Sequence, residues 1–405
     1  MEEWKEYKLG DFMEFNPRIS LKKNTVARKI TMDQLIPHSR DIYSWVYEPY
    51  SGGAKFQNGD TIMARITPCL ENGKHAFISM LDENEIAYGS TEYIVIRGRY
   101  GVSDNVFVYY LSHVPSFKEA AVKSMVGSSG RQRAQVDVLK NLTMKLPSLP
   151  EQRKIAGTLS KFDDKIAINK RINDNLEQQA QALFKSWFVD FEPFRDQSFV
   201  ESELGMIPEG WRVVALDELC SFISRGLTPK YDERSDELIL GQTCVRNNIV
   251  TLDNARKHKP KQKTEKWVQQ WDTLINSTGV GSLGRVGIVY FNMDNVAIDS
   301  HITVVRPKTA LLRHFVGRNL LSRQLEIENM AVGSTGQTEL PKDRVKYLPI
   351  IMPDDNALKH FNDVIEPIAR LLYRNIEESR RLASLRDILL PRLMSGEIKV
   401  NDLIA

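Results

Sequence analysis

The chain has 405 residues, of which 42% are hydrophobic and 26% charged, as in soluble globular proteins with two or three domains. Its 55 Lys and Arg residues nearly balance its 52 Asp and Glu residues, so net charge alone indicates no polyanionic partner. There is no apolar run of about 18 residues, the N-terminus MEEWKEYKLGDF lacks an apolar signal segment, and Cys69, Cys220 and Cys244 are isolated. These features argue against a membrane span, secretion, a disulfide framework and a zinc site, and we expect a cytoplasmic protein.

In chain order, each half of the sequence presents the same series of expected elements. A Trp-led opening, at Trp4 and again at Trp211, is followed by a variable basic region and then by short β-rich runs. Among these runs, DTIMARI at 60–66 matches DTLINST at 272–278, and EYIVIR at 92–97 matches HITVVR at 301–306. A short helix over about 105–124 or 311–330, a Gly-Ser loop, a Pro-bounded strand and a long helix complete each half.

The best match between the halves lies in the Gly-Ser loop and the strand after it. GSSGRQRAQVDVLKNLTMKLP at 127–147 aligns without a gap with GSTGQTELPKDRVKYLPIIMP at 333–353, an offset of 206 positions. The middle of each half differs strongly between the copies. Such an internal repeat predicts two similar domains on one scaffold, with different targets.

The long helices show the alternating four-three spacing of a coiled-coil seam. Asn169 and Asn375 also correspond and fall on seam positions, where each either rejects wrong registers or points to the wet edge of the seam. Two helices of about 35 residues would each be roughly 50 Å long, and packed together they would hold the two domains about one to one and a half DNA turns apart. The apolar seam positions are Ile155, Leu159, Phe162, Ile166, Ile172, Leu176, Ala180, Leu183 and Trp187 in the first helix, and Leu358, Phe361, Ile365, Ile368, Leu372, Leu382, Leu389 and Leu393 in the second.

Motifs for catalysis are absent from the sequence. It has no GxxxxGK[ST], HExxH or CxxC, and no methyltransferase-type NPPY or DPPY. A GxGxxG occurs at 279–284, but the strand-like RVGIVYF that follows favours a glycine-rich hairpin over a nucleotide-binding helix start. We therefore predict no catalytic residue, no metal site and no cofactor in this chain.

Two helical runs resemble a known family. LPSLPEQRKIAGTLSKFDDKIAINKRINDNLEQQAQALFKSWF at 146–188 is similar to the central helical region of the specificity subunits of Type I restriction–modification enzymes. LRDILLPRLMSGEIKV at 385–400 is similar to their distal helical region. The second helix departs from the pattern, because it begins with PDDNALKHF in place of the LPEQ form.

This resemblance implies an α+β fold with two α/β target-recognition domains in tandem, a pair of long antiparallel coiled-coil helices and a pseudo-twofold internal repeat. The expected division is a first recognition domain at 1–150, a helical spacer at 151–192, a second recognition domain at 193–353 and a C-terminal spacer at 354–405. Each domain would read one half of a bipartite, asymmetric site in double-stranded DNA. Two methyltransferase subunits and restriction subunits would be partners, and S-adenosylmethionine, ATP and Mg would bind to those partners.

Residues that read DNA should lie in the variable loops or the Gly-Ser loop. Arg pairs with guanine and Asn or Gln with adenine, whereas Lys and Arg also bind phosphate. His301 is a candidate for readout or for a structural hydrogen bond, and its counterpart is Glu92 or Tyr93. The predicted DNA-binding residues are Arg18, Lys22, Lys23, Arg65, Lys74, Arg131, Gln132 and Arg133 in the first domain, and Arg225, Lys230, Arg246, Asn247, Arg285, His301, Gln337 and Thr338 in the second.

Three other protein classes are alternatives. A free-standing DNA-binding regulator would bind its site tightly without partners. A coiled-coil scaffold would bind no nucleic acid, and a self-contained nuclease or methyltransferase would need the motifs that are missing.

Overall fold

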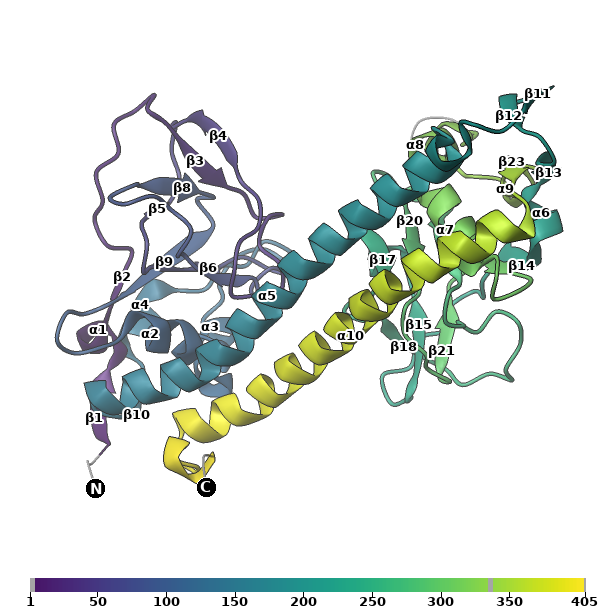
Figure 1. Cartoon of the computed structure of the whole chain (residues 1–405). Coiled ribbons are helices and arrows are strands. Elements are labelled where there is room, and N and C mark those ends of the chain that lie inside the picture. The colour runs from purple at the N-terminus through teal and green to yellow at the C-terminus, as the bar shows by residue number, and fades with distance from the viewer. Residues whose placement is uncertain (1–3, 334–337, 404–405) are drawn as a thin grey trace. The chain divides into compact units, whose positions relative to one another are not determined.

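The computed structural model describes residues 4–333 and 338–403 of the chain (Figure 1). It divides into two compact units, one made of Met1–Asn169 with Glu378–Ala405 and the other of Lys170–Glu377. Both long helices, α5 (Leu149–Phe188) and α10 (Asp355–Met394), contribute one half to each unit. Each unit therefore contains a mixed α/β domain and two helix halves.

The first unit is built around a four-stranded sheet of order β2-β9-β6-β7, beside a second sheet of order β4-β3-β8-β5. Strands β6 and β9 are buried over TIMA and YIVI, which explains their continuous apolar sequence. The elements before α5 are β1 (Lys5–Lys8), α1 (Leu9–Phe12), β2 (Met13–Phe15), β3 (Val26–Ile30), β4 (Val46–Pro49), β5 (Lys55–Phe56), β6 (Thr61–Ala64), β7 (His75–Phe77), β8 (Ala87–Gly89), β9 (Tyr93–Gly98), α2 (Asn105–Leu111), α3 (Pro115–Lys123), α4 (Val136–Asn141) and β10 (Thr143–Leu146).

The second unit repeats this topology in a sheet of order β14-β22-β19-β20, extended by β17 and β16. A three-stranded sheet of order β18-β15-β21 accompanies it. Its elements are β11 (Phe199–Ser202), β12 (Gly205–Pro208), β13 (Arg212–Ala215), α6 (Leu216–Leu219), β14 (Cys220–Arg225), β15 (Glu237–Leu240), β16 (Val245–Arg246), β17 (Asn248–Val250), β18 (Arg256–His258), β19 (Thr273–Asn276), β20 (Val286–Ile288), β21 (Val296–Ile298), β22 (Ile302–Pro307), α7 (Arg313–Ser322), α8 (Gln324–Asn329), α9 (Lys342–Lys346) and β23 (Pro349–Met352), and three short 3-10 helices lie at Glu192–Phe194, Gln242–Cys244 and, in the first unit, Val400–Leu403.

A buried ion pair marks the same place in both copies. Asp60 before β6 accepts from Arg97 at 2.6 Å, and Asp272 before β19 accepts from Arg306 at 2.7 Å. Both aspartates are 0% exposed, so each carboxylate depends on its arginine for compensation. The pair ties two adjacent strands of the main sheet, β6 to β9 and β19 to β22.

The short helix expected in each copy is broken in two. In the first unit α2 is capped by Asp104, whose side chain accepts from the amides of Val106 and Phe107. Pro115 begins α3, because proline fits the first turn of a helix but not its interior. In the second unit, α7 and α8 meet at Arg323.

The two long helices run antiparallel within each unit. In the first unit Asn169 of α5 donates to Glu378 of α10 at 2.8 Å, and Asp163 pairs with Arg386 further along. In the second, Asn375 donates to Asn173 at 2.8 Å. Along the helix pair, the residue numbers therefore increase in opposite directions in the two helices.

Both seam asparagines are buried and make hydrogen bonds across the helix pair. Asn169 is 1% exposed and Asn375 is 7% exposed. Asn169 also donates to Ser379 at 3.3 Å, and this contact is the repeat of Asn375–Asn173 at the offset of 206. The wet-edge interpretation is therefore wrong for both residues. The assignment of Ile172 to the seam is also wrong, since Ile172 is 38% exposed and Asn173 takes its place.

Each unit has its own apolar core that includes helix residues. Ile155 and Leu159 of α5 and Leu393 of α10 pack in the first core, and Phe184 and Phe361 in the second. Among the helices in the described residues, none has the length and apolar composition needed to cross a membrane.

Candidate nucleic-acid interface

In the second unit, loops that carry predicted DNA-binding residues gather at one end of the main sheet. Strands β14, β19 and β16 finish there, whereas β22, β20 and β17 begin there, as the pairing registers require. We call this the loop end of the sheet. Arg225, Arg246, Arg285 and His301 lie in or next to these strand ends.

The glycine-rich segment 279–284 forms a hairpin at the loop end, as the sequence predicted. Strands β19 and β20 on its two sides are antiparallel, and Gly279, Gly281 and Gly284 have φ angles of 97°, 71° and 80°. Arg285 donates to the carbonyl of Gly281 at 2.6 Å. The segment is therefore a loop between two antiparallel strands and not the phosphate-binding N-terminus of a helix.

His301 lies exposed beside this hairpin. Its Nδ1 is 2.9 Å from Oγ1 of Thr278, and Gln242 donates to the same Oγ1 at 2.9 Å. The backbone amide of His301 is fixed by Asp299 at 2.9 Å. The exposed imidazole is thus oriented by neighbours, an arrangement that suits a group which presents one ring nitrogen to a ligand.

Arg225 holds the Gly-Ser loop in place from within. It donates to the carbonyl of Leu340 and to the carboxylate of Glu339, both at 2.7 Å. Burial lowers the pKa of Arg225, although Glu339 opposes that shift. An antiparallel bridge between Val332 and Glu339 closes the loop. Of the two residues predicted on this loop, Thr338 is half-buried and Gln337 lies outside the described residues.

The first unit has a loop end of the same kind, where β2 and β6 finish and β7 and β9 begin. Arg65 follows β6 and donates to the carbonyl of Ala134 at 3.1 Å. Arg133 pairs with Glu92 at 2.7 Å, and its backbone bridges Val126 to close the Gly-Ser loop. The predicted residues Arg131 and Gln132 lie within this closed loop and are exposed and half-buried, respectively.

The other predicted residues lie elsewhere or have internal partners. Lys74 precedes β7, but its ammonium group donates to the carbonyl of Met32 at 2.7 Å. Lys230 is exposed on the segment after β14. Arg18, Lys22 and Lys23 are exposed on the segment between β2 and β3. Arg246 and Asn247, by contrast, are exposed at the loop end of the second unit, where β16 ends and the turn to β17 follows.

Sequence reasoning missed the partners that orient these side chains. Glu92, and not Tyr93, is the counterpart of His301, because β9 begins at Tyr93 and β22 at Ile302. Gln242 and Thr278 gave no motif signal. Arg133 aligns with Glu339 at the offset of 206, and this reversal of charge was the available sign that each had a local partner.

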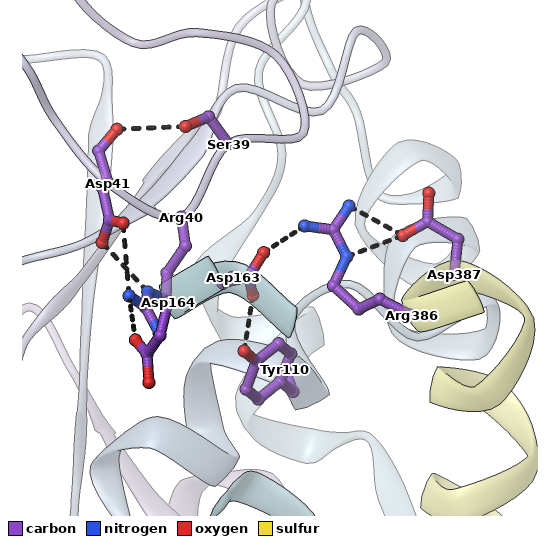
Figure 2. Close-up of polar contacts among 8 residues, drawn as sticks. All are labelled: Ser39, Arg40, Asp41, Tyr110, Asp163, Asp164, Arg386 and Asp387. Carbon is purple, nitrogen blue, oxygen red and sulfur yellow. Dashed lines mark hydrogen bonds and ion pairs between the residues drawn. The ribbon is translucent and has the colours of Figure 1, made fainter. Parts of the chain in front are cut away.

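In the first unit, a polar network joins the α/β domain to the long helices (Figure 2). Asp163 of α5 accepts from the hydroxyl of Tyr110 in α2 at 2.5 Å and from Arg386 of α10. Burial raises the pKa of Asp163, although Arg386 opposes that shift. Arg40 pairs with Asp164 at 2.7 Å, which fixes the segment that follows β3. A cavity of about 220 Å³ adjoins this network and is lined by Tyr110 and Arg386, among others.

Among the described residues, no group of three or more His, Cys, Asp or Glu side chains is placed to hold a metal ion. The two loop ends present hydrogen-bonding and charged side chains.

Comparisons with known proteins agree with this arrangement. The family profile of the Type I restriction modification DNA specificity domain matches residues 1–178 and 208–378. The chain is 30% identical over 311 residues to the Type I restriction enzyme MjaIX specificity subunit of Methanocaldococcus jannaschii, covering 73% of this chain and 70% of that protein. It is 23% identical to the HindI specificity subunit of Haemophilus influenzae, covering 98% and 100% of the two chains.

A solved structure shares the fold. The S subunit of a Type I restriction-modification system from M. genitalium superimposes with a TM-score of 0.55 at 15% identity, covering 97% of this chain and 96% of that chain. The profile covers most of the chain in two copies, one for each loop end. The chain therefore belongs to the family of specificity subunits of Type I restriction–modification enzymes, which supply DNA sequence recognition.

Proposed function

We propose that this chain reads a bipartite, asymmetric DNA site, with one half-site for each recognition domain. The observation that carries the proposal is that two loop ends of the same topology present different side chains. His301 and Arg285 stand in the second where Glu92 and Lys74 stand in the first, each pair preceding equivalent strands. Because the two loop ends share a topology but present different side chains, they favour recognition of two different half-site sequences over a palindromic site.

The predicted residues divide by their surroundings into three groups. Exposed cations away from the hairpins suit phosphate contacts, which give affinity and a salt dependence. Residues of the loop ends suit base edges, and cations with internal partners suit loop positioning. The proposed phosphate group is Arg18, Lys22, Lys23 and Lys230; the base-reading group is Arg131, Gln132, Arg246, Asn247, His301 and Thr338; and the positioning group is Arg65, Lys74, Arg133, Arg225 and Arg285. Gln337 lies outside the described residues, and we assign it to base reading from the sequence alone.

The helices at 151–192 and 354–405 would act as spacers and as docking surfaces for two methyltransferase subunits, with restriction subunits joining the complex. S-adenosylmethionine, ATP and Mg would then bind to the partners, and this chain would be a non-catalytic subunit. The recognition domains would occupy 1–150 and 193–353. Membership of the specificity-subunit family supports this division of labour.

Exchange of one recognition domain tests the proposal. The chain is co-expressed with its methyltransferase subunits, and methylated adenines are mapped across the host genome. Replacing residues 193–353 by the corresponding domain of a relative should change one half-site and leave the other unchanged. A change in both half-sites, or in neither, would refute the proposal that each recognition domain reads one half-site.

Helix length tests the spacer role. Adding or removing one turn in one helix should alter the gap between the half-sites without altering their sequences. A constant gap would exclude the spacer. A gel shift with and without the methyltransferase separates a partner-dependent subunit from a free-standing regulator, which would bind fully alone.

A further inference from the structure

The turn that joins β16 to β17 is where the sheet of the second unit departs from that of the first. Val245 pairs with Val250 and Arg246 with Ile249, which leaves Asn247 and Asn248 as a two-residue turn. Their φ angles of 51° and 66° are the consecutive positive values typical of a tight hairpin. The first unit's sheet order, β2-β9-β6-β7, contains no such pair of strands within the described residues.

This turn lies at the loop end of the sheet. Strand β17 runs parallel to β20, and Asn248 pairs with Gly287, so both strands begin at the same end. Arg246 and Asn247 are exposed there. An arginine and an asparagine side by side offer the two side chains that pair best with guanine and adenine in the major groove.

A carboxylate of the long helix α5 holds the turn through a hydrogen bond. Oε1 of Glu177 in α5 accepts from Nδ2 of Asn248 at 3.2 Å, and from Nη1 of Arg318 in α7 at 2.6 Å. Arg318 is 2% exposed and also donates to the hydroxyl of Tyr290 at 2.7 Å. The other oxygen, Oε2, is buried and has no hydrogen-bond partner among the described residues.

Oε1 also accepts from Nε2 of Gln181 in α5 at 3.0 Å, so donors from the turn, from α7 and from α5 meet at one oxygen. Glu177 therefore links the turn to α7 as well as to α5. Helix α7 is packed closely on the sheet, since a Cβ on Gly317 would lie 2.9 Å from Ile288 of β20. A buried ion pair of this kind has little freedom to shift, because moving either partner exposes an uncompensated charge. The position of the turn is thus fixed relative to both helices.

We propose that Glu177 is a positioning residue for specificity: through Asn248 it sets where Arg246 and Asn247 meet the bases. The inference rests on the proposed function, and it assigns to the helix a part in sequence choice in addition to spacing. The residue acts through the turn and has no contact with DNA itself.

The variant Asn248→Gly tests this link while sparing the buried pair. Glycine adopts positive φ without strain, so the turn keeps its shape, and only the bond to Glu177 is lost. The full chain is co-expressed with its methyltransferase subunits, and methylated sites are sequenced. We expect discrimination at one or two positions of the second half-site to fall by about 5- to 100-fold, with the first half-site unchanged.

Asn84→Gly provides a matched control, since Asn84 also has a positive φ of 59° but lies in an exposed loop of the first unit. Its site preferences should equal those of the parent chain. Glu177→Gln gives a second test, in which the amide keeps an acceptor for Asn248 but removes the charge that Arg318 needs. It should relax the same positions and also lower the thermal midpoint.

Unchanged preferences at the second half-site in Asn248→Gly would overturn the inference. Equal weakening of both half-sites would do so as well, because it would show a general structural role. The methylated sites of the parent chain distinguish failure of this inference from failure of the proposed function. If those sites are not bipartite, the proposed function itself is wrong.

Discussion

The pair formed by Asp163 and Arg386 should behave as a coupled unit in stability measurements. Asp163 is 3% exposed and Arg386 is 7% exposed, and the carboxylate also accepts from Tyr110. Asp163→Ala leaves a buried guanidinium without its main partner, which typically costs about 3–5 kcal/mol. We expect the lower part of this range, because Arg386 keeps a second ion pair with Asp387.

The second unit indicates how the double variant should behave. At the offset of 206, Asp163 corresponds to Ala369 and Arg386 to Ala180, both buried in the second core. The chain thus accommodates two alanines at the equivalent positions. Asp163→Ala combined with Arg386→Ala should be less destabilising than the sum of the single changes, by about 1.5–3 kcal/mol.

Hydrogen exchange measured on the full chain provides the assay, because the opening free energy of amides in α2 and in α5 up to Asn169 reports on the first unit. Amides of β19 and β22 in the second unit serve as the internal control and should not change. Additive effects within about 0.5 kcal/mol would refute the coupling.

Arg386→Ala should also lower the opening free energy of the first unit less at pH 5 than at pH 8. Without Arg386 the pKa of Asp163, already raised by burial, rises further, so the native state takes up a proton that the unfolded state does not.

Three further predictions concern strand β7, helix α7 and the long helix α5. Burial lowers the pKa of His75 to about 3 from 6.5, so the unfolded state gains a proton first as pH falls. Between pH 7.5 and 5.5 the first unit should lose about 1.4 kcal/mol through this residue, and His75→Asn should flatten that slope in exchange measurements; an equal slope would contradict the assignment. Gly317→Ala should destabilise the second unit by about 1–3 kcal/mol in urea unfolding, because its Cβ would lie 2.9 Å from Ile288. Gly157→Ala in α5 should instead stabilise by up to about 1 kcal/mol, since a Cβ there meets nothing within 4 Å; the same sign for both glycines would refute the reasoning.

The repeat and the helices could be predicted from sequence because their signals are local. The spacing of the apolar residues from Ile155 to Trp187 predicted a long helix, and α5 spans Leu149–Phe188. The glycine-rich hairpin was also predictable, because the strand after Gly284 excludes a helix start. The error at Ile172 has a physical cause: hydrophobicity suggested the seam for Ile172, whereas Asn173 occupies it and makes hydrogen bonds with Asn375 and with the carbonyl of Leu372.

The grouping of loops could not be read from sequence, since it depends on strand order. Arg246 and His301 are 55 positions apart, yet they meet one end of one sheet because β17 is parallel to β20. Roles within the loops were equally hidden. Arg225 and Arg133 look like any exposed arginine in sequence, but each has an internal partner.

These internal partners suggest how one fold can support two recognition domains with different DNA targets. In the first unit the loop stem carries the cation, Arg133, and the strand start carries the anion, Glu92. In the second unit the stem carries the anion, Glu339, and the cation Arg225 ends a different strand. Each Gly-Ser loop is therefore held by an ion pair of opposite polarity. A single residue moved from one loop to the other would place like charges together, so the anchoring pair and the loop that it holds must change as one module.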